Sequence, residues 1–235
     1  MRHSLAQVTL FLVCSGLQKE SRPVELHLAL RRVVLLGTPL TLAILEFFHP
    51  LVSRDLAGTL FPVAGWWVTL HVVQLVLFAL MGAALWLLTD GLHGIATTVS
   101  RLGAAVFVVF YGAGEALLGI ATGILALGAG DLPTEVREGR AEAIARVFED
   151  PIANVLYLVG ELGWLVGLLA AVVALYASRS PRLPLVLLVL SGCILLVFDH
   201  PAPYGPIVFG SFFLGALWLE LTRGRRSVAR RPRVA

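Results

Sequence analysis

The sequence predicts an all-α polytopic membrane protein, folded as a bundle of six transmembrane helices. Of its 235 residues, 58% are apolar and 14% are charged, whereas soluble domains are about one quarter charged and less than half apolar. The mean hydropathy is +0.87, and the apolar residues gather in runs near the ~20 that a helix needs to cross a bilayer. This composition excludes a water-soluble globule, and two cysteines are too few for a disulfide scaffold.

Six segments approach the length of a spanning helix. The second opens with Trp66 and Trp67, which we expect at the membrane interface, and the third is long enough to tilt. The last two are short, and if they did not both cross the membrane they would form a re-entrant pair. The six predicted spans are residues 33–49, 66–88, 102–127, 152–176, 183–198 and 206–221.

The positions of arginine and lysine predict the orientation, because cytoplasmic loops retain positive charge during insertion. With both termini in the cytoplasm, fourteen of the eighteen cations lie inside. Seventeen of them are arginine, a bias typical of a GC-rich bacterial genome, so we expect the bacterial cytoplasmic (inner) membrane. The cations gather at chain ends and in loops rather than on one folded face, so no nucleic-acid partner is expected.

Three segments outside the spans complete the predicted organisation. Residues 1–32 are expected to be a flexible or interfacial cytoplasmic segment without a cleaved leader, since no A-x-A-like site follows. Residues 223–235 form a basic cytoplasmic tail, expected to anchor the topology. The long outer loop, 131–150, is predicted as a short surface helix or, as the favoured alternative, a solvated connector. Asp150 can cap the fourth span, with Pro151 in its first turn.

Polar and ionisable side chains inside the spans gather in their outer half. Such groups are costly in a bilayer, and each is by default a functional candidate. Counting ~1.5 Å per residue along each helix places them between the outer boundary and the midplane. They are Glu46 and His49 on the first span, His71 and Gln74 on the second, Tyr111 and Glu115 on the third, Asn154, Tyr157 and Glu161 on the fourth, and Asp199 and His200 closing the fifth.

The three carboxylates inside the spans, Glu46, Glu115 and Glu161, have no lysine or arginine at their depth. A carboxylate in such a setting keeps its proton, pairs with a protonated histidine or binds a metal ion. The first interpretation is therefore a site for a divalent metal ion. Residues 46–49 (EFFH) match one Glu-x-x-His element of carboxylate metal sites in helix bundles, although no second such element exists. The candidate ligands, of a type that suits zinc, iron or copper, are Glu46, His49, His71, Glu115, Glu161 and His200.

A second interpretation is a pocket for a proton, a cation or a small organic ligand, open to the exterior. Its candidate lining residues are Gln74, Tyr111, Asn154, Tyr157 and Asp199. A haem held by His49 and His71 is less favoured, because their estimated depths differ by about one helical turn.

A third interpretation is structural, with each polar contact between helices adding ~0.6 kcal/mol in lipid. This structural interpretation explains any single polar residue better than it explains the whole group, because several acids without cations would not hold helices together. Glycines at 119 and 123 and at 163 and 167 form small-xxx-small faces. We expect these faces to bring the third and fourth spans together.

Three segments, residues 66–88, 101–125 and 187–210, resemble a group of multi-pass membrane proteins of actinobacteria and related bacteria that carry no assigned activity. The resemblance covers residues 33–221 and implies a helical integral membrane protein. His71, Glu115, Asp199 and His200 fall within these segments, and the resemblance implies an acidic residue at position 115.

The leading functional hypothesis is that this chain binds or passes a cation, metal or small ligand through an outward-facing polar cluster within the membrane. A membrane-embedded metalloenzyme or redox protein is one alternative, and an accessory or scaffold subunit without chemistry is another. The lipid bilayer is the expected partner. Whether the chain is an enzyme, and whether it forms a homo-oligomer, is left open by the sequence.

Overall fold

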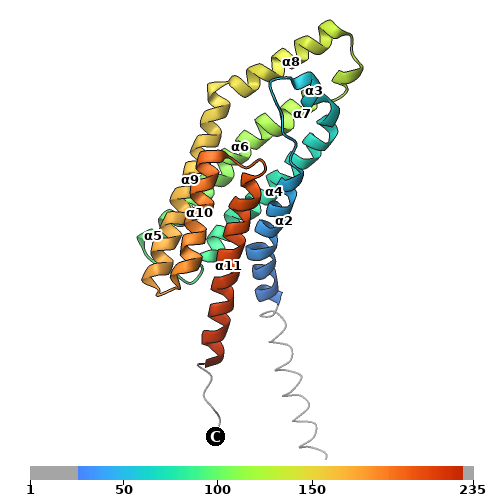
Figure 1. The fold of residues 1–235 in the computed structure, drawn as a ribbon. Coiled ribbons are helices and arrows are strands. Elements are labelled where there is room, and N and C mark those ends of the chain that lie inside the picture. Colours follow the sequence, from blue (N-terminus) through green and yellow to red (C-terminus); the bar gives the residue numbers. More distant parts are fainter. Residues whose placement is uncertain (1–25, 230–235) are drawn as a thin grey trace, which may run out of the picture.

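A computed structural model describes residues 26–229, and beyond residue 223 the backbone alone. All regular structure in this range is helical, which confirms the predicted all-α class (Figure 1). The flanks carry large apolar side chains such as Val76, Val173 and Leu214, which are 60%, 59% and 51% exposed. Apolar surface of this extent is typical of a membrane-contacting protein.

Five helical stretches are long and apolar enough to cross a membrane. The helix α10 (Arg182–Phe198) is also apolar, but its 17 residues are fewer than in any of these five. The predicted count of six spans is therefore not confirmed, although every predicted span overlaps one of these six elements. The five stretches are Leu26–Phe48, Leu56–Leu88, Ile95–Asp131, Pro151–Ala177 and Tyr204–Arg223.

Several of the stretches are built from more than one helical element. The first contains η1 (Val33–Gly37), α2 (Thr38–Leu45) and η2 (Glu46–Phe48), and the second contains α3 (Leu56–Thr59), η3 (Phe61–Val63) and α4 (Ala64–Leu88). The third contains α5 (Ile95–Val106), η4 (Phe107–Tyr111), α6 (Gly112–Gly114), η5 (Glu115–Ala121), α7 (Thr122–Ala126) and η6 (Ala129–Asp131). The remaining helices are α8 (Thr134–Glu149), α9 (Pro151–Ala177), α10 and α11 (Tyr204–Ala229).

Two predicted boundaries need correction. Residues 26–32 are helical and continue into η1, because this leucine- and alanine-rich stretch favours helix and contains no breaker. The helix α11 runs to Ala229 and so includes the start of the predicted basic tail. The remainder of the two predicted terminal segments, residues 1–25 and 230–235, lies outside the described residues.

The third stretch is irregular where its polar residues lie. The π-helical segments η4 and η5 lie on either side of α6, and π turns inside α-helices frequently occur at functional sites. Tyr111 ends η4 and Glu115 begins η5. Both side chains therefore leave the helix where its winding changes, a feature that hydrophobic periodicity does not reveal.

The glycines allow close packing, although not all as predicted. Gly163 and Gly167 do face the third stretch, where a Cβ on Gly103 would come within 2.6 Å of the Gly163 carbonyl oxygen. The other predicted pair faces α4 instead, because a Cβ on Gly119 would overlap the ring of His71 and one on Gly123 would meet Trp67. The expectation that both pairs form one interface is therefore wrong.

The loop between the third and fourth stretches forms the helix α8, which confirms the first of the two predicted alternatives. Asp150 accepts a hydrogen bond from the backbone amide of Ile152 at 2.8 Å, and Pro151 is the first residue of α9. This confirms the predicted N-terminal cap. Together with α3 and α7, α8 covers one end of the bundle (Figure 1).

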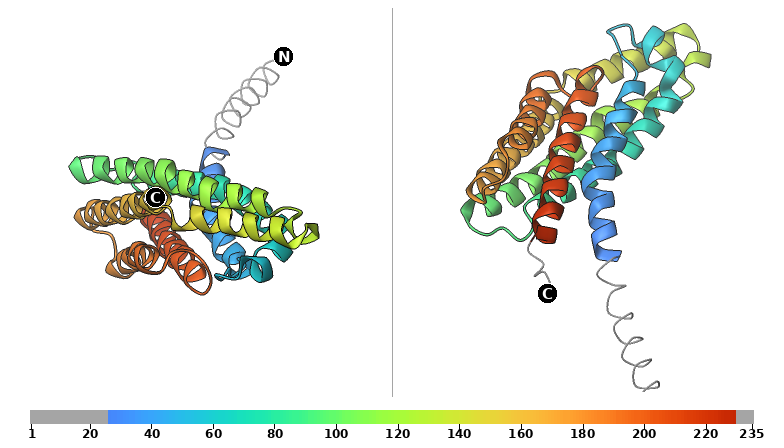
Figure 2. Two further views of the ribbon diagram at one scale, coloured as in Figure 1. Left: turned by 90° about the horizontal axis from the view of Figure 1, so that it is seen from above. Right: turned by 60° about the horizontal axis from the view of Figure 1, so that its bottom comes forward.

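Both ends of the described chain lie at the opposite end of the bundle (Figures 1 and 2). There Glu220 forms ion pairs with Arg31 at 2.7 Å and with Arg223 at 3.4 Å. The same two arginines donate to the carbonyls of Leu87 and Leu88 at the end of α4. Arginine at a helix C-terminus satisfies carbonyls that lack an intrahelical partner, so this network joins the first, second and last stretches.

The apolar core consists of a larger and a smaller cluster. The larger lies within the bundle around the fully buried side chains of Phe107, Trp164 and Phe212, and the smaller lies beneath α8 around Leu60 and Ile144. The predicted functional residues lie where these two clusters meet, since Trp67 belongs to the smaller one and Tyr111 to the larger.

Candidate metal centre

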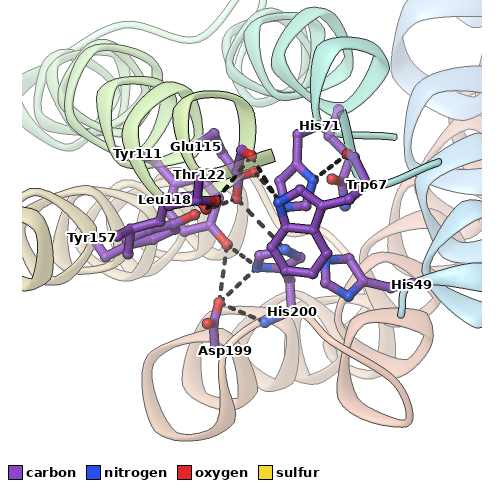
Figure 3. A network of polar contacts seen from close by, with 12 residues as sticks. His49, Trp67, His71, Tyr111, Glu115, Leu118, Thr122, Tyr157, Asp199 and His200 are labelled. Carbon is purple, nitrogen blue, oxygen red and sulfur yellow. Dashed lines mark hydrogen bonds and ion pairs between the residues drawn. The ribbon is translucent and has the colours of Figure 1, made fainter. Parts of the chain in front are cut away.

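Three histidines from separate segments of the chain meet in the interior (Figure 3). His49 directly follows η2, His71 lies on α4, and His200 lies in the turn between α10 and α11. They are 7%, 2% and 3% exposed. One ligand nitrogen of each lies within 4.8 Å of those of the other two. The structure thus brings together all three of the histidines that the sequence singles out.

In each of these histidines the Nδ1 atom already contacts an oxygen. The Nδ1 atoms of His49, His71 and His200 lie 3.0, 2.7 and 2.7 Å from the carbonyl of Pro50, the carbonyl of Trp67 and the carboxylate Oδ1 of Asp199. These carbonyl and carboxylate oxygens only accept, so each Nδ1 is placed to donate to them, and in a neutral ring Nε2 then keeps its lone pair. Nδ1 of His200 also lies 2.7 Å from the Tyr111 hydroxyl. Histidines that bind metals are held in the same way. The Nε2 atoms of His49 and His200 are buried and have no hydrogen-bond partner among the described residues.

The spacing suits a tetrahedral ion after a small contraction. Zinc binds imidazole nitrogen at about 2.0–2.1 Å, which places two nitrogen ligands about 3.3 Å apart. Nitrogens that start within 4.8 Å of one another reach this separation when each ring moves by about an ångström. The site therefore needs no rearrangement of the backbone to close around an ion.

Glu115 occupies a further side of the cluster. Its Oε1 accepts a hydrogen bond from the Tyr157 hydroxyl at 2.9 Å and lies 3.6 Å from Nε2 of His200. Its Oε2 lies 3.9 Å from Nε2 of His71 and is buried without a hydrogen-bond partner in the described chain. The carboxylate therefore faces the free nitrogens of two histidines, where a fourth metal ligand would be expected.

Asp199 binds the side of His200 that faces away from the other two histidines. Its Oδ1 accepts from the backbone amide and from Nδ1 of His200, both at 2.7 Å, and from the Tyr111 hydroxyl at 3.2 Å. Asp199 has a φ of 60°, a left-handed conformation that costs a non-glycine residue on the order of 1–3 kcal/mol and often marks a functional site. The three hydrogen bonds offset this strain and orient the imidazole.

The electrostatics of these residues favour a cation. Burial opposes ionisation of Asp199, yet His200 and the hydrogen bonds it donates lower the pKa of Asp199 to about 2. Burial also disfavours a charged His200, but the carboxylates of Asp199 and Glu115 raise its pKa well above the usual value. Burial and the charge of His200 lower the pKa of His49 to about 3. The carboxylates that stabilise a proton on His200 would equally stabilise a divalent cation in its place.

Glu46 lies beside the cluster and is paired differently from the prediction. Its Oε1 accepts from Nε2 of Gln74 at 2.7 Å, and its Oε2 is buried without a partner in the described chain. The predicted Glu-x-x-His element lies at the end of a helix rather than within one, because the helix tightens into the 3-10 turn η2 and ends there. His49 is already extended, with ψ at 121°, and the carboxylate of Glu46 is hydrogen-bonded to Gln74.

A cavity of about 930 Å³ opens beside the three histidines. Of the other predicted residues, Asp199, Tyr157 and Glu161 line it, and Glu161 is only 8% exposed. Asn154 lines it as well, but its amide donates to the carbonyls of Phe148 and Asp150 and so holds the start of α9.

Trp67 is a member of the site, although the sequence pattern predicted another place for it. It was expected at the interface beside Trp66, yet it is 5% exposed. Its Nε1 donates to the Gly119 carbonyl at 2.7 Å, its own carbonyl accepts from His71, and its ring packs 4.3 Å from that of His71. The four-residue spacing of Trp67 and His71 on one helix was the signal that could have revealed this.

The positions of His49 and His71 also test whether these two residues could hold a haem. The rings of His49 and His71 are neighbours, with centroids 5.3 Å apart and an edge-on interplanar angle of 71°. A porphyrin between them would have to push apart rings that are already in contact. Haem is thus disfavoured by the lack of space, whereas the sequence disfavoured it on estimated depth.

Comparisons with known protein families, curated proteins and solved structures give no significant match to this chain. What the site can do must therefore be argued from its donors. Three neutral imidazoles and a carboxylate form a ligand set for zinc, copper, iron or nickel, and each imidazole has the second contact that such a ligand needs.

Proposed function

We propose that this chain is a polytopic membrane protein that binds a divalent transition-metal ion through Nε2 of His49, His71 and His200. One observation carries the proposal. Three buried imidazoles from separate segments each donate Nδ1 to an oxygen and place a ring nitrogen within 4.8 Å of the other two. Zinc is the first candidate, since it favours three or four such ligands in tetrahedral geometry.

The charges around the cluster support a dication. The hydrogen-bond and ion-pair partners of Asp199 and Glu115 are imidazoles, tyrosine hydroxyls and one backbone amide. When a dication replaces the proton of His200, the imidazoles are neutral, and the ionised carboxylates of Asp199 and Glu115 would balance its two charges. Glu115 lies on the side of the ion away from the cavity and adds negative charge there, so that a position on the cavity side stays open.

The proposal includes six passes in a bacterial inner membrane, with both termini in the cytoplasm. α10 packs between α9 and α11, as a sixth, shorter pass would. Both described ends lie at one end of the bundle, and an even number of passes explains this. The positive-inside rule then makes that end cytoplasmic, and the metal centre lies toward the outer face.

The core supports binding rather than passage of the ion. On the cytoplasmic side of the cluster lie the aromatic side chains of Phe78, Phe107 and Trp164, which are at most 1% exposed. An ion crossing this layer would lose its ligands without gaining others, at a high cost in a low-dielectric medium.

The test is metal stoichiometry in the purified full-length protein. The chain is produced with an affinity tag that contains no histidine, stripped with chelator, loaded with zinc, copper, iron or nickel, and analysed by mass spectrometry of the elements. We expect one zinc per chain. The variants His71→Ala and His200→Ala should each lose more than the 10–100-fold in affinity that a second-contact change causes.

His93→Ala is the matched control, because His93 is exposed and lies outside the cluster. It should bind zinc like the unaltered protein. Equal zinc in His71→Ala, or an equal loss in His93→Ala, would show adventitious binding and contradict the proposal. Failure of the unaltered protein to bind any of the four metals would instead favour a packing role for the histidines, as in a scaffold subunit.

A further inference from the structure

The cavity beside the metal centre is lined by polar and by apolar side chains. The polar ones include His49, His71 and Glu161, and the apolar ones include the leucines at 51, 118 and 158. At about 930 Å³, the cavity matches the size of a small-molecule site, typically 300–1,000 Å³. An occupant that matches this lining has a polar group at the histidines and an apolar body against the leucines.

The apolar part of the lining reaches the outside of the bundle. Leu51 and Leu158 line the cavity and are also 71% and 49% exposed. Near them in the chain, Phe48 and Ile152 are 63% and 70% exposed. Apolar side chains exposed on a membrane-spanning bundle contact acyl chains, so acyl chains can reach two of the leucines that line the cavity. Arg54, which also lines it, marks the level of the polar interface.

An ion held by three histidines presents a reactive position to this cavity. Catalytic zinc typically keeps three protein ligands and one water, sometimes with a fifth ligand, and lowers the pKa of that water to about 7. All three histidines line the cavity, whereas Glu115 is fully buried behind them. A water on the ion would therefore face the cavity, on the same side as the carboxylate of Glu161.

We infer that the protein hydrolyses an acyl ester or amide bond of a single-chain amphiphile, which enters from the outer leaflet between Leu51 and Leu158. This inference rests on the metal centre proposed above. Its new elements are the substrate class, the reaction and the role of Glu161, a buried acid that no structural contact in the described chain explains.

The reaction balances without any further reagent. Glu161 would take one proton from a water molecule in the cavity, and the oxygen of that water would form a bond to the acyl carbon. The bond from that carbon to the ester oxygen or amide nitrogen would break, and Glu161 would return its proton to this leaving atom. The products are a carboxylic acid, which loses its remaining proton to water and becomes a carboxylate, and an alcohol or amine. An ion held by the three histidines would supply the polarisation of the carbonyl oxygen and lower the pKa of the water.

The test uses the full-length protein in nanodiscs of diether phosphatidylcholine, whose chains contain no ester. Zinc-loaded protein is given p-nitrophenyl esters from acetate to laurate, and the rate with His71→Ala is subtracted. We expect kcat/KM to rise at least about 10-fold with chain length, since each further CH₂ that is buried against the leucines strengthens binding. Glu161→Gln should lower kcat/KM by at least about 100-fold and retain its zinc.

Two further variants sharpen the result. Leu158→Trp narrows the entrance and should reduce the rate with laurate more than the rate with acetate. Glu142→Gln, on the exposed face of α8, is the matched control for loss of a carboxylate and should leave both rates unchanged.

The outcomes separate the two proposals. No zinc in the unaltered protein contradicts the metal centre itself. One zinc per chain with no hydrolysis above His71→Ala overturns the present inference and leaves the metal centre standing. Equal rates for acetate and laurate overturn the amphiphile, and an unchanged rate in Glu161→Gln overturns the role of that residue.

Discussion

The two ends of the bundle both hold carboxylates, but they provide different partners for them. At the end with the chain termini, Glu220 lies between Arg31 and Arg223. At the other end, Asp199 and Glu115 face imidazoles and tyrosine hydroxyls. A guanidinium group is always charged and fixes its partner permanently, whereas an imidazole can lose its proton and bind a metal. The type of partner therefore distinguishes a structural ion pair from a candidate site.

The geometry of the two ends supports the same distinction. Arg31 and Arg223 also donate to the last carbonyls of α4, so both guanidinium groups are paired within the protein. At the other end the Nε2 atoms of His49 and His200 and the Oε2 atom of Glu115 are buried without hydrogen-bond partners in the described chain. Buried polar groups are normally paired, and three exceptions in one place indicate a ligand.

The largest expected effect comes from the arginine end. Glu220→Gln removes the charge that holds Arg31 and Arg223 side by side, and the side chains of Arg31 and Glu220 are only 11% and 13% exposed. Breaking a buried pair in this way should lower the free energy of unfolding by roughly 3 kcal/mol, measured by reversible unfolding in mixed micelles. Zinc affinity should not change.

Glu142→Gln provides the exposed counterpart, because Glu142 pairs with Arg146 at 2.5 Å on the surface of α8. It should cost less than about 0.5 kcal/mol. A stability loss as small in Glu220→Gln, or a change in its zinc affinity, would remove the distinction between the two ends.

The sequence carried enough information for the fold class and for the residues of the site, because both depend on local chemistry. Long apolar runs predict helices in lipid, and an acid or histidine within such a run can be recognised as a functional candidate. The apolar helical stretches lie within a few residues of the predicted spans, except where they begin earlier, at Leu26, Leu56 and Ile95. The predicted count of six spans stays unconfirmed because α10 is shorter than the other five stretches.

The local geometry of the site was not predictable, because it depends on how helices end and wind. His49 reaches the cluster only because the first stretch tightens into η2 and then becomes extended. Tyr111 and Glu115 lie at π-helical junctions that no periodicity reveals. The burial of Trp67 could not be predicted without knowing which face of α4 packs inside the bundle. At each of these places the chain departs from the regular helix that the sequence pattern assumes.

The second largest expected effect concerns the packing of α4 against η5 beside His71. Gly119 leaves room for His71, and a Cβ there would overlap the imidazole. Gly119→Ala should displace His71 and weaken zinc binding by about 100-fold, near the upper end of the effect of disturbing a ligand's surroundings. Competition with a chelator of known affinity measures this. Gly65→Ala, on α4 with open space around the new Cβ, should bind zinc normally, and an equal loss in both variants would refute the argument.

The smallest of the three effects tests whether Asp199 acts through its negative charge or through the shape of its turn. Asn tolerates a positive φ and keeps one acceptor oxygen, so Asp199→Asn should preserve the turn and the orientation of His200 while removing the negative charge behind it. Second contacts of this kind change metal affinity by 10–100-fold, and we expect a loss of about 10-fold in zinc affinity with little change in thermal stability. Asp55→Asn is the control, because Asp55 caps the neighbouring helix α3 without contacting the histidines. If Asp199→Asn binds zinc as tightly as the unaltered protein, the carboxylate only shapes the turn, and the contrast between the two ends then rests on the imidazoles alone.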